Sequence, residues 1–193
     1  MNGNLTLRRA SADELRRFYD WMKEQFHAGE LKPLWLLEQL SEKRLYAAYG
    51  LWDEETLLAY ALVANTADGK MHLLDYYAVL PEHQDAGWGS RFLQMLRREL
   101  SGDVLLLEVE DPAYAPDSEE AEHCSRRIRF YERNGCLHTK LELVLFGFDY
   151  VIMKLPLEGE AEDDRAKASL KEIYRTFFPP EAYAENVRFR DEK

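Results

Sequence analysis

The sequence has very little cysteine and no long apolar run. Only Cys124 and Cys136 occur among 193 residues, without Cys-x-x-Cys spacing, so neither a disulfide framework nor a zinc site is indicated. No apolar stretch approaches the roughly twenty residues that a membrane-spanning helix needs. Residues 1–4 lack the basic region followed by an apolar run that a secretory leader requires. We therefore expect a cytoplasmic protein with no membrane partner and no bound metal.

Positive charge is also in deficit. The chain has 25 Lys and Arg residues against 36 Asp and Glu residues, which gives a formal net charge of −11. Such a chain repels nucleic acid and anionic lipid, and it favours a cationic substrate, whether a small molecule or a peptide. A hydrophobic share of 46% suffices for one compact domain with a substantial core.

The most informative stretch runs from Met71 to Leu100, and its pattern predicts a strand, a tight turn and an amphipathic helix. The strand ends at Pro81, and Gly87 and Gly89 precede the body of the helix. A helix start leaves backbone N–H groups unpaired and carries roughly half a positive charge, so it attracts an anion. The two glycines remove Cβ atoms that would hold a bulky phosphate away.

Two common phosphate loops are excluded at this turn. A serine, not a lysine, follows the second glycine, and Phe92 stands where a dinucleotide-binding turn needs a third glycine. The residues do match Q-x-x-G-x-G over 84–89, after a strand that ends in V-x-P over 79–81. This pattern resembles the acyl-CoA-binding motif of the GNAT superfamily of N-acetyltransferases. In that family the loop holds the coenzyme A pyrophosphate, and the preceding strand pairs with the pantetheine arm.

The resemblance implies acetyl-CoA as the cofactor. Asp85 departs from the family pattern, because a small residue is usual there, and its side chain must point away from the phosphates. Arg127 either supplies positive charge to a phosphate or pairs with the acidic segment at 119–122. The implied acetyl-CoA-binding residues are Ala78, Val79, Gln84, Asp85, Ala86, Gly87, Trp88, Gly89, Ser90, Arg127, Tyr131 and Asn134.

A second motif lies at residues 128–136, where a tyrosine precedes a glycine by four positions near the end of a predicted helix. This segment is similar to the GNAT segment whose tyrosine protonates the departing thiolate. A phenol with a pKa near 10 is protonated at neutral pH and can serve as that acid. Tyr131 is therefore a candidate catalytic residue, and the alternative is a core tyrosine with one structural hydrogen bond.

The candidate general bases are Glu108 and Asp75. An alkylammonium with a pKa near 10 is neutral in only about one molecule in a thousand at pH 7, so a base must take its proton. Glu108 occupies the position of a glutamate that some family members use, and Asp75 lies on the strand where related enzymes place a carboxylate. Both residues are equally compatible with a structural role.

The order of predicted elements favours a GNAT-like α/β fold, with a mixed, mostly antiparallel sheet of six to seven strands and helices on both faces. We expect the acetyltransferase domain at 1–155, an acidic linker at 156–165 and a helical extension at 166–193. An acidic loop is expected over 111–125, followed by a helix over 126–134. The last strands are expected at 141–146 and 149–155.

An apolar stripe marks the last predicted helix, which is expected to stop at Pro179-Pro180. We expect this helix to dock on the body of the protein or on a second subunit in a homodimer. The stripe consists of Leu170, Ile173, Tyr174 and Phe177.

These patterns predict an acetyltransferase that moves an acetyl group from acetyl-CoA to a primary amine by direct attack. The competing interpretation is a non-catalytic CoA-binding or interaction protein that retains the fold, because a fold alone does not establish a function.

Overall fold

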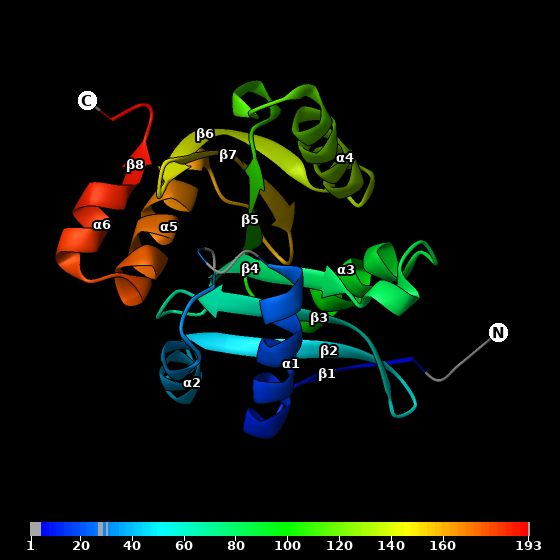
Figure 1. The fold of residues 1–193 in the computed structure, drawn as a ribbon. Coiled ribbons are helices and arrows are strands. Elements are labelled where there is room, and N and C mark those ends of the chain that lie inside the picture. The colour runs from blue at the N-terminus through cyan, green and yellow to red at the C-terminus, as the bar shows by residue number, and fades with distance from the viewer. Residues whose placement is uncertain (1–4, 27–28, 30, 193) are drawn as a thin grey trace.

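The computed structural model describes residues 5–26, 29 and 31–192. The N-terminal residues 1–4, on which the expected absence of a leader rests, lie outside this description. One sheet of eight strands forms the centre of the described chain, in the order β1-β2-β3-β4-β5-β7-β6-β8, and only β4 and β5 run parallel (Figure 1). The strands are β1 (Leu5–Arg9), β2 (Tyr46–Asp53), β3 (Thr56–Asn65), β4 (Met71–Val79), β5 (Val104–Glu110), β6 (Leu137–Leu145), β7 (Phe148–Pro156) and β8 (Val187–Phe189).

Six helices accompany this sheet among the described residues, together with short 3₁₀ turns at Pro81–His83 and Pro112–Tyr114. The mixed, mostly antiparallel sheet with helices confirms the predicted fold class. The helices are α1 (Ala12–Gln25), α2 (Leu34–Glu42), α3 (Trp88–Glu99), α4 (Ser118–Arg133), α5 (Asp163–Phe177) and α6 (Pro180–Asn186).

Each face of the sheet packs against its own set of helices. On one face, α1, α2 and α5 bury Phe18, Leu37 and Leu170 in the larger apolar cluster. On the other face, α3 buries Phe92 in a second apolar cluster. Helix α4 packs Phe130 against this second cluster. Figure 1 shows α5 beside α6 at one end of the molecule, away from α3. The two faces of the sheet therefore carry different helices and can carry different functions.

The sequence determines several of these elements locally. Ser11 and Glu14 form a capping box at the start of α1, in which each side chain accepts a hydrogen bond from the other residue's backbone N–H. In β5, Val104 and Leu106 join one apolar cluster, whereas Leu105 joins the other. This alternation is what a strand buried on both faces requires.

Helix α4 starts earlier than the sequence predicts. The expected loop over 111–125 was wrong in its second half, because α4 begins at Ser118. The Asp117 side chain accepts hydrogen bonds from the backbone N–H groups of Glu119 and Glu120 and so caps the helix. The acidic residues thus stabilise a helix start, where the helix dipole favours negative charge.

The C-terminal region also contains more structure than expected. Pro179-Pro180 ends α5 as predicted, but Pro180 also opens α6, because proline is well tolerated in the first helical turn. Beyond α6, β8 pairs antiparallel with β6 through Phe189 and Leu143. Strand β6 in turn begins at Leu137, four residues earlier than predicted.

Helix α5 forms with its apolar stripe facing the sheet. Leu170, Ile173, Tyr174 and Phe177 are all buried in the larger cluster beside residues of β2, β4 and β5. The predicted docking of this helix on the body of the protein is therefore confirmed. Among the described helices, none combines the length and apolarity needed to cross a membrane.

The packing of α5 predicts a large cost for truncating one of its core side chains. Leu170→Ala removes a side chain with 0% exposure, so the free energy of unfolding should fall by about 2–5 kcal/mol in a urea titration. Leu137→Ala makes the same chemical change at a residue that is 52% exposed, and it should stay within about 0.5 kcal/mol of the parent. Equal effects of the two substitutions would contradict the docked position of α5.

Candidate functional site

The candidate site is organised by the point where β4 and β5 stop pairing. Their parallel ladder ends at Leu74 opposite Leu107. Past this point β5 stays paired with β7, and β4 stays paired with β3. Among the residues that the structure describes, the edge of β4 that faces β5 therefore has no strand partner over 75–79, the segment that contains Ala78 and Val79.

A β-bulge marks the divergence on β4. Val63 lies opposite Leu74, but Leu62 lies opposite Tyr76, so Asp75 is an extra residue in the pairing with β3. Such a bulge bends the strand and redirects a side chain. Asp75 and Glu108 are the residues that directly follow the last pair of the two strands, so the structure brings the two candidate bases together.

Asp75 is held in a buried polar cluster. Its carboxylate is 5% exposed and accepts a 2.7 Å charged hydrogen bond from Lys32 Nζ and a short one from the Tyr46 hydroxyl. The Lys32 side chain is itself only 14% exposed, and its ammonium lies 5.1 Å from the ring centre of Tyr76. Burial lowers the pKa of Lys32, but Asp75, Tyr76 and Glu108 together outweigh it, so the pKa lies above its usual range. Asp75 is thus paired with a cation that keeps its charge.

Glu108 differs from Asp75, because its only hydrogen-bond donor among the described residues is a neutral phenol, the Tyr174 hydroxyl. Burial raises the pKa of Glu108 to about 8, and the neighbouring Asp75 carboxylate acts in the same direction, whereas Lys32 opposes both. A carboxyl group with such a pKa can take up and release a proton near neutral pH, which is what a general base requires.

The opposite face of the sheet carries the turn that begins α3. Gly87 adopts a φ of +79°, and no side chain caps the helix that starts at Trp88. A Cβ at Gly87 would meet no atom within 4 Å, so space lies open beside the helix start. Asp85 and Ala86 are exposed in the turn, and Asp85 also has a positive φ. The uncapped N–H groups and the open space fit an anionic group such as a phosphate.

Polar side chains brace this turn. Gln84 Nε2 donates to the carbonyl of Val79 at 3.3 Å, which ties the turn to the end of β4. Asn134 Nδ2 donates to Ser90 Oγ at 3.0 Å, so the end of α4 is tied to the first turn of α3. Gly89 leaves room for Phe130, whose ring a Cβ there would meet at 3.4 Å. Several of the predicted binding residues therefore hold the turn in shape.

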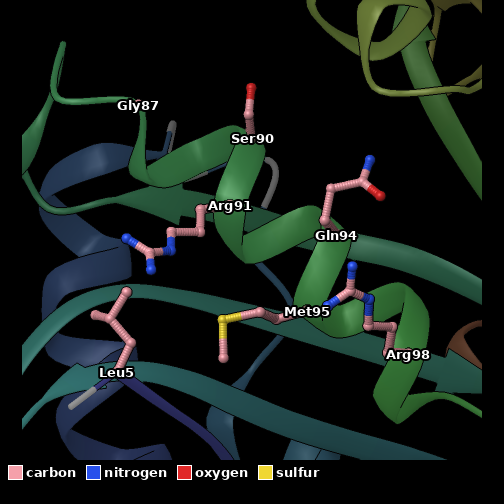
Figure 2. Close-up of a pocket in the computed structure, with 7 residues that line it drawn as sticks. All are labelled: Leu5, Gly87, Ser90, Arg91, Gln94, Met95 and Arg98. Carbon is pink, nitrogen blue, oxygen red and sulfur yellow. The ribbon is translucent and has the colours of Figure 1, made fainter. Parts of the chain in front are cut away.

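A groove of about 760 Å³ runs from the helix start along α3. Figure 2 shows Arg91, Met95 and Arg98 projecting from successive turns of α3, with Leu5 of β1 beyond them. The two arginines bring positive charge to a groove that begins at Gly87. Sequence reasoning missed both, although their spacing of one and three turns from Gly87 places them on one side of the helix.

Arg127 lies elsewhere, in an ion pair with Glu110 at the end of β5. The partner is Glu110 and not the expected segment 119–122, whereas a role of Arg127 toward a phosphate stays a prediction. The oxygen and sulfur atoms of Glu110, Glu120 and Cys124 lie within 4.8 Å of one another, as metal ligands would. Arg127 already occupies the carboxylate of Glu110, which argues for an ion-pair network in this place.

Tyr131 projects from α4 into the apolar cluster on the same face as α3, where it lies against Phe130. Burial raises its pKa to about 12, although Arg127 opposes the shift. Within the described part of the chain, its hydroxyl has no hydrogen-bond partner. It is thus a protonated donor without an assigned acceptor, as an acid that awaits a thiolate would be.

Comparison with known proteins adds a family assignment to this geometry. The model of the acetyltransferase (GNAT) family matches residues 15–136, which is more than half of the chain. In the comparison of this chain with curated proteins, no match was found.

Solved structures share the fold at low sequence identity. A protein from Bacteroides thetaiotaomicron assigned to the GNAT family is 18% identical, with a TM-score of 0.67 over 84% of this chain and 92% of its own. The ribosomal-protein-S18-alanine N-acetyltransferase from Escherichia coli is 21% identical, with a TM-score of 0.58 over 82% and 97%. The spermidine N-acetyltransferase from Vibrio cholerae, solved with CoA and spermine, is 16% identical, with a TM-score of 0.53 over 81% and 97%.

The raised pKa of Glu108 predicts how stability changes with pH. The folded protein holds this proton up to about pH 8, whereas the unfolded chain releases it near pH 4.5, so the contribution to stability is lost as pH rises between them. The free energy of unfolding should fall by up to about 1.4 kcal/mol per pH unit in this window. Glu108→Gln should flatten the profile in urea titrations, and Glu82→Gln, at an exposed residue, should follow the parent. A Glu108→Gln profile parallel to the parent would show that the folded pKa is ordinary.

Proposed function

The chain belongs to the GNAT acetyltransferase family, and from this premise we propose that it transfers an acetyl group from acetyl-CoA to a primary amine by direct attack. The observation that carries the proposal is the divergence of β4 and β5. The divergence leaves a free strand edge on β4. The α3 turn and Tyr131 lie on one face of the sheet at this edge, and Glu108 lies on the other face. A thioester lying along that edge would meet an acid and a base from opposite faces.

The proposed acetyl-CoA site begins at the α3 turn. The uncapped helix start and the open space at Gly87 support a pyrophosphate there, and the groove with Arg91 and Arg98 supports further negative charge. The free edge of β4 at Ala78 and Val79 offers backbone groups to an extended chain such as pantetheine. Acetyl-CoA supplies the activated thioester carbonyl.

Glu108 is the proposed base, in preference to Asp75. The negative charge of Asp75 is compensated by Lys32, and the carboxylate accepts a second hydrogen bond from Tyr46. Asp75 therefore serves best as a fixed countercharge. Glu108 has a pKa of about 8, so it can exchange a proton near neutral pH, where the acceptor amine carries a proton that must be removed. It takes the proton of the acceptor ammonium, and the neutral nitrogen then forms the new C–N bond.

Tyr131 is the proposed acid. As the C–S bond breaks, its hydroxyl gives a proton to the departing sulfur, and solvent restores it. Direct attack is supported by the two cysteines, because burial raises the pKa of Cys124 and raises that of Cys136 to about 12. Neither thiol is suited to carry the acetyl group as a thiolate.

The proposed acceptor is a cationic primary amine, small or peptidic. The net charge of −11 favours such a substrate. Two of the proteins that share the fold are named for amine acceptors, spermidine in one and the alanine of a ribosomal protein in the other.

Tyr131→Phe should lower kcat about a hundredfold or more while leaving the affinity for CoA unchanged, because it removes a proton donor that acts only in the transition state. A panel of polyamines, lysine derivatives and peptides with free N-termini, assayed for release of CoA thiol, identifies the acceptor and gives the parent rate. Tyr114→Phe, which removes the hydroxyl of an exposed tyrosine, is the matched control. CoA binding without turnover on any amine would support the non-catalytic alternative instead.

Gly87→Val should abolish CoA binding in calorimetry, because its side chain enters the space beside the α3 start. Gly147→Val is a matched control, since Gly147 has a φ of +85°, close to the +79° of Gly87, and equally open surroundings in the β6–β7 turn. Both variants carry the same backbone strain, but only the first should lose the ligand. Parent-like CoA affinity in a folded Gly87→Val protein would place the site elsewhere.

A further inference from the structure

Helix α5 lies outside residues 15–136, which the family model matches, yet it reaches the candidate base. Its face toward the sheet carries Tyr174 and, one turn later, Phe177. The Phe177 ring covers the Lys32 ammonium at 4.4 Å. The Tyr174 hydroxyl donates a hydrogen bond to Glu108 Oε1. The last long helix therefore contacts both the cation and the titrating carboxyl group of the polar cluster.

The position of Tyr174 is closely determined. The residue is 1% exposed, and its ring centre lies 6.4 Å from the ring centres of both Phe177 and Phe178. A phenylalanine would fill the same apolar space, so packing does not account for the hydroxyl. A buried hydroxyl is costly without a partner, and Glu108 is the partner that it has.

We propose that Tyr174 is a positioning residue that orients Glu108 for proton transfer, so that α5 forms part of the active site. This inference rests on the proposed function, in which Glu108 is the base. The hydrogen bond fixes one carboxyl oxygen and leaves the other to accept the proton of the acceptor amine. Tyr174 touches Glu108 and acts on the reaction only through it.

The hydrogen bond also has an electrostatic effect. An O–H donor stabilises the ionised form of a carboxyl group more than the neutral form. The titratable and charged groups around Glu108 are Asp75 on β4, Lys32 before α2, Tyr46 on β2 and Tyr174 on α5. Of these, Asp75 disfavours ionisation, whereas Lys32 and Tyr174 favour it. Removing the Tyr174 hydroxyl therefore makes Glu108 harder to ionise.

Tyr174→Phe in the full chain tests this role. The protein is labelled with ¹³C at the glutamate carboxyl, and Glu108 is titrated by NMR, with Glu108→Gln to assign its signal. The midpoint should rise by about one pH unit, which is the scale of a single charge-assisted hydrogen bond. The acid limb of kcat/KM should move with it, so the rate at pH 7 falls about tenfold. The rate at pH 10 and the KM for acetyl-CoA should remain unchanged.

Two further variants sharpen the test. Tyr183→Phe removes a hydroxyl from α6, in the same tail, and should leave both profiles in place. Tyr174→3-fluorotyrosine keeps the ring and makes the hydroxyl a stronger donor, so the Glu108 midpoint should move to lower pH. This second change is also informative if the phenylalanine variant does not fold.

Three results would be decisive. An unchanged Glu108 midpoint in a folded Tyr174→Phe protein overturns the proposal, and so does a shifted midpoint with an unmoved acid limb. If the parent acetylates no amine, the proposed function fails, while the NMR titration still reports whether Tyr174 controls Glu108. The two failures are therefore distinguishable.

Discussion

The separation of β4 from β5 shapes the candidate site and the packing on both faces of the sheet. The two strands share a ladder only as far as Leu74 and Leu107, and the bulge at Asp75 turns β4 away. A buried strand edge without a partner is costly, because its N–H and C=O groups lose water without gaining hydrogen bonds. The fold accepts this cost in the interior of an eight-stranded sheet, and the unpaired edge is what an extended ligand needs.

The polar cluster shows how charge is tolerated beside that edge. Asp75 has Lys32 as its countercharge, and the two side chains form a largely buried ion pair. Within the described part of the chain, Glu108 has only the Tyr174 hydroxyl as a donor, and the repulsion from Asp75 adds to the effect of burial. Two carboxyl groups that directly follow the last paired residues of β4 and β5 therefore have different surroundings, an ion pair at Asp75 and a neutral phenol at Glu108.

Most of the fold and part of the site could be predicted from the sequence. The motif at 84–89, the tyrosine at 131 and the carboxylates at 75 and 108 could be chosen as candidates because they resemble positions of the GNAT pattern on predictable elements. The bulge at Asp75 was not, because it exists only in the register between β3 and β4. The contact of Tyr174 with Glu108 joins residues 66 positions apart, and Tyr174 looked like any other member of an apolar stripe. Short β8 is likewise defined by its pairing with β6 and not by its own three residues.

The late position of α5 in the chain has a consequence for biogenesis. During synthesis, β1 to β7 leave the ribosome before α5 does. These strands can therefore pair while the face that carries Asp75 and Glu108 is still exposed to solvent. In that nascent state the Glu108 carboxyl group is hydrated, so burial does not yet raise its pKa. Arrival of α5 expels the water, and the Glu108 proton affinity rises at that moment. The raised pKa of Glu108 therefore depends on a segment that is synthesised after the first seven strands, and a stalled or nicked chain that lacks the helix would have those strands without it.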